Sequence, residues 1–140
     1  MSRELRGVFA GALAAFVWGA AEPLLRRAVG TPYSDIRLLG RTLTDGPHWR
    51  SAGLVLHTGN GAAFGWVFAR MGGRGWKQGI AAAELETIAL WPGMAVVDRV
   101  HPDRREGRWP PLVTNGRAFA LTAAGHAVFG LILGSLVTDD

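Results

Sequence analysis

Four long apolar stretches constrain the fold of this 140-residue chain more than any other feature. They cover residues 7–25, 51–69, 79–97 and 118–138, and each is 19 to 21 residues long. A helix of that length rises about 30 Å, which matches the hydrocarbon core of a bilayer. The sequence therefore predicts four membrane-spanning helices.

A soluble helical bundle is a poor alternative, because its outer helices would need a polar face. The stretches 51–69 and 118–138 contain no Asp, Glu, Lys or Arg. A domain of this size can bury one such helix completely but hardly several. We therefore predict an all-α fold, a four-helix transmembrane bundle that forms a single integral membrane domain over residues 1–140.

The flanks of the stretches agree with a multi-pass protein of the cell (cytoplasmic) membrane. Trp49, Trp76 and Trp109 lie just outside them, where aromatic rings collect at lipid headgroups. The segments 26–50 and 98–117 carry more arginine than the opposite side, which favours a cytoplasmic position for both. The lipid bilayer is the expected partner.

Charge and cysteine content exclude other classes. The formal net charge of +4 would by itself suit nucleic acid. However, the arginines cluster between long runs without a basic residue, and no stripe of aromatic and basic residues is present. No nucleic-acid partner is therefore expected. The chain has no cysteine, so disulfides and thiolate metal sites are excluded.

The segment LHTGNGAAFGW (residues 56–66) has two interpretations. Gly59, Gly61 and Gly65 could form a phosphate-binding loop of a soluble nucleotide-binding domain. Their spacing departs from the dinucleotide fingerprint, and the chain lacks the alternating strands of the surrounding sheet. On a helix, the same glycines form a contact that lets two backbones approach closely in lipid. The G-x-x-x-G pairs predicted to pack helices are Gly7/Gly11, Gly61/Gly65 and Gly130/Gly134.

A faint internal repeat is also present. Residues 7–27 align without gaps to residues 79–99, and NGAAFG (60–65) resembles GHAVFG (125–130). Such a repeat predicts two tandem helical hairpins.

Polar residues inside the stretches are the candidate functional residues, because they are costly in hydrocarbon. They are Glu22, His57, Asn60, Glu84, Glu86 and His126. The helical rise places Asn60, Glu86 and His126 near the bilayer midplane. We expect these three to share a pocket, with His57 and Glu22 nearer one membrane face. Such a cluster could relay protons, hold a cation or bind a polar headgroup.

The alternative is that each polar residue makes one interhelical hydrogen bond and fixes packing. This role is preferred for His57 and Asn60, whereas Glu86 and His126 leave both roles open because a buried acid must be paired or protonated. Glu22 lies close to Arg26 and Arg27 in sequence, which predicts an interfacial ion pair. Pro23 and Pro92 are expected to kink or end helices.

No cofactor, metal or catalytic residue is expected. His57 and His126 could ligate a haem, but nothing besides two imidazoles supports one. His48 and His101 have no neighbouring ligands at metal spacing and are expected to be solvated. Residues 31–49 predict a short helix on the membrane surface, and residues 101–111 an exposed loop.

The motifs LLG (38–40), LH…NGAAFG (56–65), ALWP (89–92) and D-R-x-H-P (98–102) resemble small, uncharacterised bacterial membrane proteins with four helices. The likeness covers most of the chain and implies location and helix count only. We expect a structural or accessory protein that packs against a membrane-protein partner or against its own copies. The alternatives are a small transporter or channel using Glu86 and His126, and a nucleotide-binding domain using Gly59–Gly65.

Overall fold

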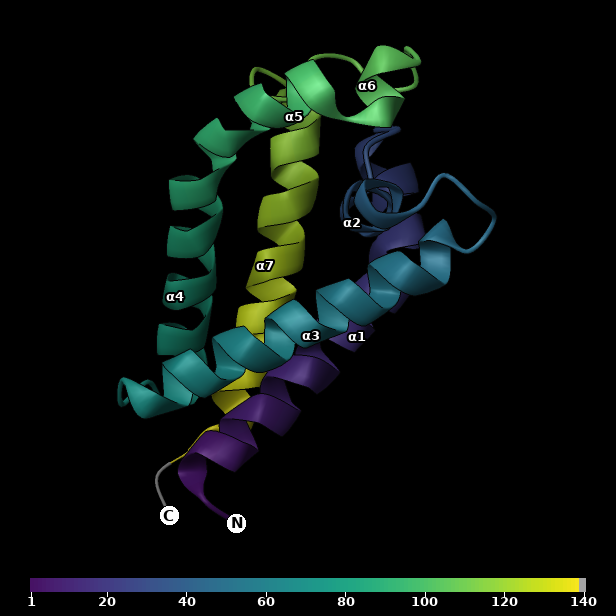
Figure 1. The fold of residues 1–140 in the computed structure, drawn as a ribbon. Helices are drawn as coiled ribbons and strands as arrows, with labels where there is room; N and C mark the ends of the chain where they lie inside the picture. Colours follow the sequence, from purple (N-terminus) through teal and green to yellow (C-terminus); the bar gives the residue numbers. More distant parts are fainter. Residues whose placement is uncertain (139–140) are drawn as a thin grey trace.

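A computed structural model describes residues 1–138, and all regular structure in that range is helical (Figure 1). The predicted all-α fold is therefore confirmed. The long helices are α1 (Arg3–Val29), α3 (Trp49–Arg70), α4 (Gly75–Leu90) and α7 (Gly116–Leu136). The short ones are α2 (Asp35–Leu43), the 3₁₀ turn η1 (Trp91–Gly93), α5 (Met94–Val100) and α6 (Pro102–Arg105).

Three helical segments within residues 1–138 are long and apolar enough to cross a membrane. They are α1, the segment Gly75–Val100, and α7, and they suggest membrane association. The fourth predicted span forms α3, which is long enough at 22 residues but less apolar. His57, Asn60 and several glycines lower its hydropathy.

The two prolines behave differently. The predicted span 79–97 is not one regular helix, because the α-helical pattern gives way to the turn η1 around Pro92. A proline ring lacks the backbone N–H that an α-helix interior requires. Pro23, by contrast, lies inside α1, which continues to Val29.

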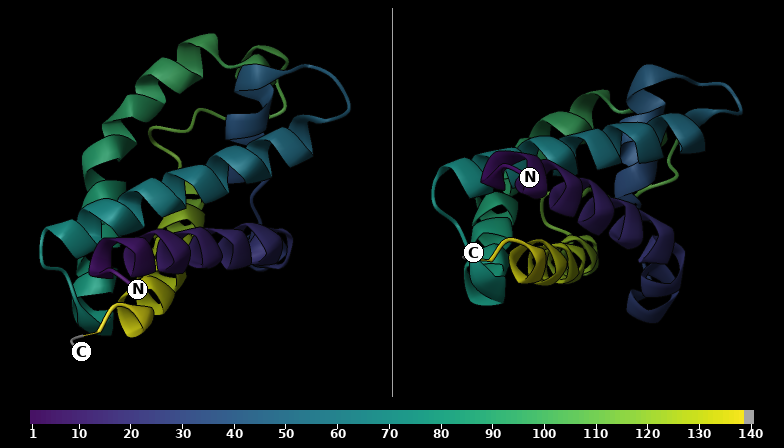
Figure 2. Two further views of the ribbon diagram at one scale, coloured as in Figure 1. Left: turned by 60° about the horizontal axis from the view of Figure 1, so that its bottom comes forward. Right: turned by 90° about the horizontal axis from the view of Figure 1, so that it is seen from below.

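The long helices pack as two antiparallel pairs. α1 packs mainly against α3, and α4 mainly against α7, while α7 also contacts α1 and joins the pairs (Figure 2). The N-terminus, the turn between α3 and α4, and the end of α7 lie at the same end of the molecule (Figure 1). This is the pairing that two tandem hairpins require.

Glycines bring α1 and α3 into backbone contact. A Cβ atom on Gly11 would overlap the carbonyl oxygen of Gly61, and one on Gly65 would overlap that of Gly7. The four glycines predicted to pack these helices therefore do so against one another. Residues 56–66 are helical throughout, so the glycine-loop interpretation of that segment is wrong.

The α4–α7 pair uses the same contact. A Cβ on Gly79 would overlap the carbonyl oxygen of Gly130, and one on Gly134 would overlap that of Gly75. Gly7 and Gly11 thus correspond to Gly75 and Gly79. The predicted alignment instead placed Gly7 opposite Gly79, so its register is wrong by one helical turn. Low-complexity Ala and Gly hide the register in the sequence, whereas the backbone contacts define it.

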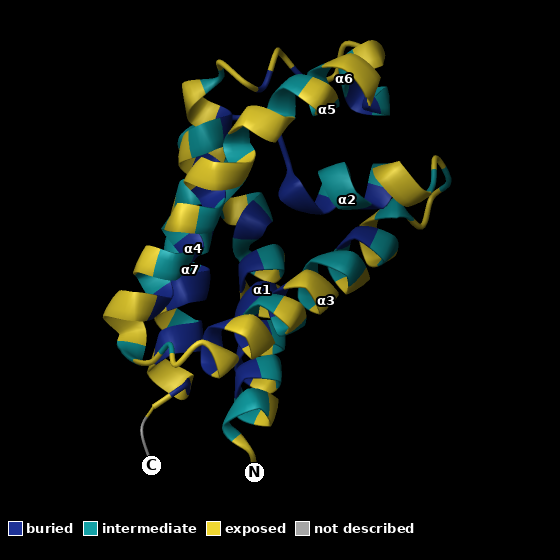
Figure 3. Cartoon of the chain, turned by 60° about the vertical axis from the view of Figure 1, so that its left-hand side comes forward, coloured by how far each residue is buried: buried dark blue, intermediate teal, exposed yellow. Residues whose placement is uncertain are grey.

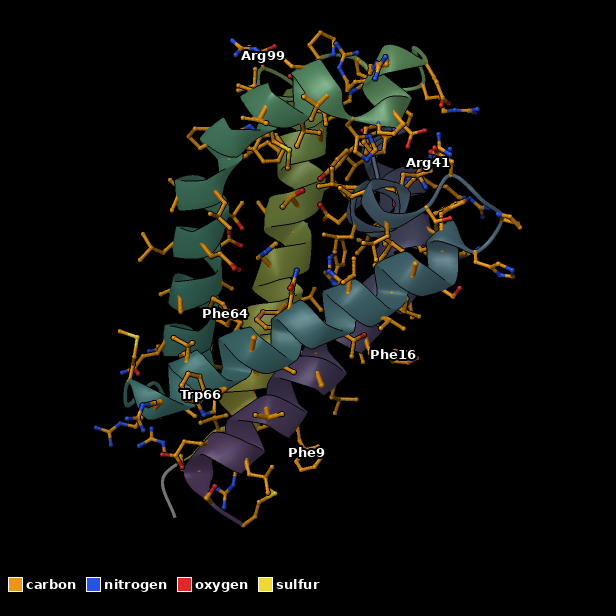
Figure 4. All side chains as sticks on the ribbon, viewed as in Figure 1. Phe9, Phe16, Arg41, Phe64, Trp66 and Arg99 are labelled. Carbon is orange, nitrogen blue, oxygen red and sulfur yellow. The ribbon has the colours of Figure 1, made fainter. Side chains whose placement is uncertain are left out.

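The outer faces of the long helices are apolar. Buried residues gather where helices face one another, and exposed residues lie on the outside (Figure 3). Phe9 and Phe16 of α1 are 60% and 49% exposed and point away from the bundle (Figure 4). Leu85 of α4 and Leu131 of α7 are exposed in the same way. Such surfaces suit lipid rather than water.

Residues 101–111, after α5, are largely exposed as predicted, but they include the short helix α6, and three of them, His101, Asp103 and Trp109, are buried. His101 is only 4% exposed and stacks on Trp109, with ring centroids 4.7 Å apart. The indole Nε1–H of Trp109 donates to the carbonyl of Pro32. His101 is therefore not solvated, and Trp109 is not an exposed headgroup anchor.

A buried carboxylate organises this end of the molecule. Asp103 is fully buried, and its Oδ2 accepts the Nε–H of Arg37 at 2.8 Å. Arg108 lies 3.3 Å from the other carboxylate oxygen. Because Arg37 belongs to α2, the pair ties α6 to α2. The predicted surface helix within residues 31–49 exists as α2, and it packs on α3 with Ile36 and Gly40 buried.

Gly65→Ala should lower the free energy of unfolding by about 1–3 kcal/mol, because the added methyl group overlaps the backbone of α1. Gly59→Ala on the same helix is the matched control, since a Cβ there meets open space. Unfolding in detergent micelles titrated with SDS measures both variants. Equal stability of the two variants would contradict the glycine contact.

Stability should fall as the pH drops below about 6.5, because burial lowers the pKa of His101. Its Nδ1 accepts the backbone N–H of Asp103, so the Nε2–H donates to the Leu38 carbonyl and the folded state holds a neutral ring. Since the folded pKa lies below the unfolded value, this contribution is present above the unfolded pKa and lost below it. Unfolding midpoints at about pH 7.5 and pH 5 measure the effect.

His101→Gln should reduce that pH dependence, and the exposed His48→Gln should leave it unchanged. If stability changes with pH equally in His101→Gln and in the unmodified protein, groups other than His101 cause the pH dependence.

Candidate functional site

A cavity of about 220 Å³ lies between the helices, with α3 and α4 both contributing to its lining. It is open to the surface at Asn60 and Leu90, which are exposed. Residues of α1, α2 and α7 complete it, together with Trp91 of η1 and Met94 of α5. The polar lining residues are Asp35, His57, Asn60, Glu86, Thr87, Thr122 and His126. Four of the six candidate residues therefore meet in one place.

The cavity follows from how the helices pair. α3 and α4 are consecutive in the chain, but each packs mainly on a different neighbour. Small residues allow close crossings at the end near the termini, and large rings fill the space beside these crossings and further along. Phe64 of α3 meets Phe129 of α7 edge to face at 5.4 Å, and Trp18 of α1 is 1% exposed. Phe64 lies on the inner side of α3 (Figure 4).

Glu86 and His126 form a pair across α4 and α7. The Nε2 atom of His126 lies 3.5 Å from a carboxylate oxygen of Glu86. Its Nδ1 lies 2.9 Å from the carbonyl of Thr122, which can only accept, so Nδ1 carries a hydrogen. Nε2 of a neutral ring would then turn its lone pair toward Glu86. A proton held between the two side chains, on either of them, removes that repulsion.

Asp35 is the functional candidate that sequence reasoning missed. It lies outside the predicted spans, in the first turn of α2. The folded chain brings it to the cavity, where its carboxylate accepts the Tyr33 hydroxyl at 2.7 Å and the Thr122 hydroxyl at 3.3 Å. Burial and the Asp35 carboxylate raise the pKa of Tyr33 well above its usual range, so Tyr33 remains a donor. The only sequence signal at Asp35 was its position directly after Ser34, a residue type that commonly caps the N-terminus of a helix.

Glu22 does not line the cavity but holds α2, which contributes to the lining. It is 2% exposed, and its carboxylate accepts the backbone N–H of Ile36 at 3.1 Å. Glu22 of α1 therefore caps the first turn of α2, where helix N–H groups have no partner of their own. Arg26 instead donates to the carbonyl of Pro32. The predicted interfacial ion pair is replaced by a buried helix cap.

The other candidates divide between lining and outer positions. His57 lines the cavity, and its buried Nε2 has no hydrogen-bond partner among the described residues. The indole Nε1 of Trp18 is also buried and has no hydrogen-bond partner among the described residues. Asn60 also lines the cavity, whereas Glu84 lies on α4 outside the lining. Unsatisfied nitrogens around a cavity indicate room for a partner.

Haem does not fit this cavity. His57 and His126 both line it, as a bis-histidine haem would require. Its volume of about 220 Å³ is nevertheless below the roughly 300–1,000 Å³ of drug-sized ligand and cofactor sites. Within residues 1–138, no group of three or more His, Asp or Glu side chains is arranged to hold a metal ion.

Chemistry alone indicates what the cavity does, since no protein-family model, curated protein or solved structure matches the chain. Two carboxylates and two imidazoles can exchange protons with each other and with a ligand. The aromatic and aliphatic wall around them lowers the local dielectric, which strengthens every charge interaction inside.

Glu22→Ala should lower the free energy of unfolding by about 1–3 kcal/mol, because it leaves the buried N–H of Ile36 without an acceptor. Glu22→Gln keeps an acceptor oxygen and should recover most of that loss. Denaturant titration in micelles measures both variants. A Gln variant as unstable as the Ala variant would show that the negative charge, rather than the cap, matters.

Proposed function

We propose that the chain is a four-span protein of the cell membrane that carries a small ligand across the bilayer in exchange for protons. The observation that carries the proposal is the cavity between the helices, in which the Nε2 atom of His126 lies 3.5 Å from a carboxylate oxygen of Glu86. This favours the transporter alternative over a purely structural role.

The fourth span is supported by how α3 distributes its polar residues. His57 and Asn60, which lower its hydropathy, both line the cavity. Its outward surface carries Val55, Trp66 and Val67, which are 72%, 45% and 44% exposed. Average hydropathy penalises a helix whose polar side chains face a cavity within the protein. Polar residues in that position are typical of transport pathways.

The Glu86–His126 pair lies where a ligand can reach it. Glu86 has a side chain that is 35% exposed and lines the cavity beside His126. Asp35 supplies a second carboxylate, held by Tyr33 and Thr122. When the same side chains bind both a proton and a ligand, binding of the ligand alters the affinity for the proton, and binding of the proton alters the affinity for the ligand.

An accessory role finds less support in the glycine pairs. Gly7, Gly11, Gly61 and Gly65 contact each other within the chain, as do Gly79 and the pair in α7. These small-residue faces are therefore occupied inside the bundle. They do not provide a surface for a partner helix or a second copy.

Uptake into proteoliposomes tests the proposed exchange. A wash of the membranes with alkaline carbonate first shows that they retain the protein. The protein is then purified and reconstituted into vesicles, across which a pH gradient is imposed. Three labelled solutes of similar size are offered separately: phenyltrimethylammonium, benzenesulfonate and phenylglycine. We expect the gradient to drive uptake of at least one above the rate of empty vesicles.

Glu86→Gln should reduce that uptake to the rate of empty vesicles, because it removes the proton-sharing carboxylate. Glu84→Gln is the matched control, two residues away on the same helix and outside the cavity, and should transport normally. Uptake of all three solutes at the rate of empty vesicles would overturn the exchange function. Equal loss in both variants would show that Glu86 has no specific role.

A further inference from the structure

The charge of the cavity selects its ligand. Asp35 and Glu86 line it, and no Lys or Arg of the described residues does. The remaining ionisable lining groups are His57 and His126, which face the carboxylates from α3 and α7. α1 contributes only Ala15 and Trp18 to the lining. When both imidazoles are neutral, the cavity carries negative charge in an apolar setting, which favours a cation and opposes an anion.

The walls favour an organic cation over an inorganic one. Trp18, Phe64, Trp91 and Phe129 all line the cavity. The Trp91 indole N–H donates to the carbonyl of Val113, which holds the ring in position. Aromatic rings attract alkylated ammonium groups through their electron-rich faces, and they also pack against an apolar body. A bare metal ion would leave these rings unused.

The volume limits the ligand to a small molecule. An engineered cavity of about 150 Å³ in another protein admits benzene. The present cavity is larger, at about 220 Å³, yet smaller than the roughly 300 Å³ at which drug-sized sites begin. A ligand with on the order of ten non-hydrogen atoms therefore fits.

We infer that the ligand exchanged at this cavity is a small alkylated ammonium cation with an apolar, typically aromatic, body. The inference rests on the proposed exchange function and adds the ligand class to it. Before binding, Glu86 and His126 share one proton and are neutral as a pair. Cation binding releases that proton to water and leaves one negative charge on the pair, which balances the ammonium. No other bond forms or breaks, and the net charge of the cavity is unchanged.

Calorimetry on the detergent-solubilised full chain tests the ligand class with three matched probes. Phenyltrimethylammonium, benzenesulfonate and 2-phenyl-2-propanol each place a tetrahedral head on a phenyl ring and have the same number of non-hydrogen atoms. The heads differ in charge and in their hydrogen-bonding groups. We expect the cation to bind at least about tenfold more tightly than the alcohol, and the anion not to bind.

Proton release is measured by repeating the titration in buffers of different ionisation enthalpy. The cation should release a proton from the unmodified protein and from Glu84→Gln. Glu86→Gln should bind it at least about tenfold more weakly and release none. This variant replaces a partly exposed side chain with one of the same shape, so the fold is retained.

The outcomes separate this inference from the proposed function. If the alcohol or the anion binds as tightly as the cation, the ligand class is wrong, while gradient-driven uptake of benzenesulfonate or phenylglycine would leave the exchange function standing. If the cation binds without releasing a proton, the displacement step is wrong. If no probe binds and none is taken up, the inference and the proposed function both fall.

Discussion

Close approach of helix backbones at glycine is the interaction on which the rest of the structure depends. Gly11 of α1 meets Gly61 of α3, and Gly79 of α4 meets Gly130 of α7, with space for no side chain between them. The hydrophobic effect does not drive helices together in lipid, so association depends on van der Waals contact between well-fitting surfaces. The short helix α2 follows the same rule, since Gly53 of α3 faces the carbonyl of Ile36.

These crossings also determine where the interior opens. Each hairpin is tight near the chain termini, where Phe129 packs beside the crossings, and the ring of Trp18 occupies the interior beyond them. The two pairs share the contact between α1 and α7, where Gly125 accepts the Trp18 ring against its backbone. α3 and α4, which have other neighbours to pack on, both contribute to the lining of the cavity. The polar residues on their inner faces therefore have space around them.

The opposite end of the molecule is held by charge rather than by small residues. Asp103 binds Arg37, and Arg41 pairs with Glu106 at 2.7 Å. Removing Arg37 would be costly because it leaves the buried carboxylate of Asp103 with less compensation. The network holds α2 in place, and α2 delivers Asp35 to the cavity while Glu22 caps its first turn. The geometry of the site thus depends on residues that never touch its interior.

The sequence by itself determined the all-α class, the positions of the long helices and most of the polar residues of the site. Helical periodicity, apolar length and the cost of burying polar groups are local properties, so they can be evaluated stretch by stretch. This is why Asn60, Glu86 and His126 were predicted to share a pocket, with His57 and Glu22 nearer one membrane face, and why the glycine pairs were assigned to helix contacts.

Only the tertiary structure decided the rest. Asp35 joins the site, Glu22 becomes a cap and His101 is buried because α2 and residues 101–111 fold back onto the bundle. Such contacts join residues far apart in the chain, and no local sequence pattern indicates that these residues meet in the fold. The register between the hairpins was likewise hidden, since many Ala and Gly alignments look alike until backbones meet at particular residues.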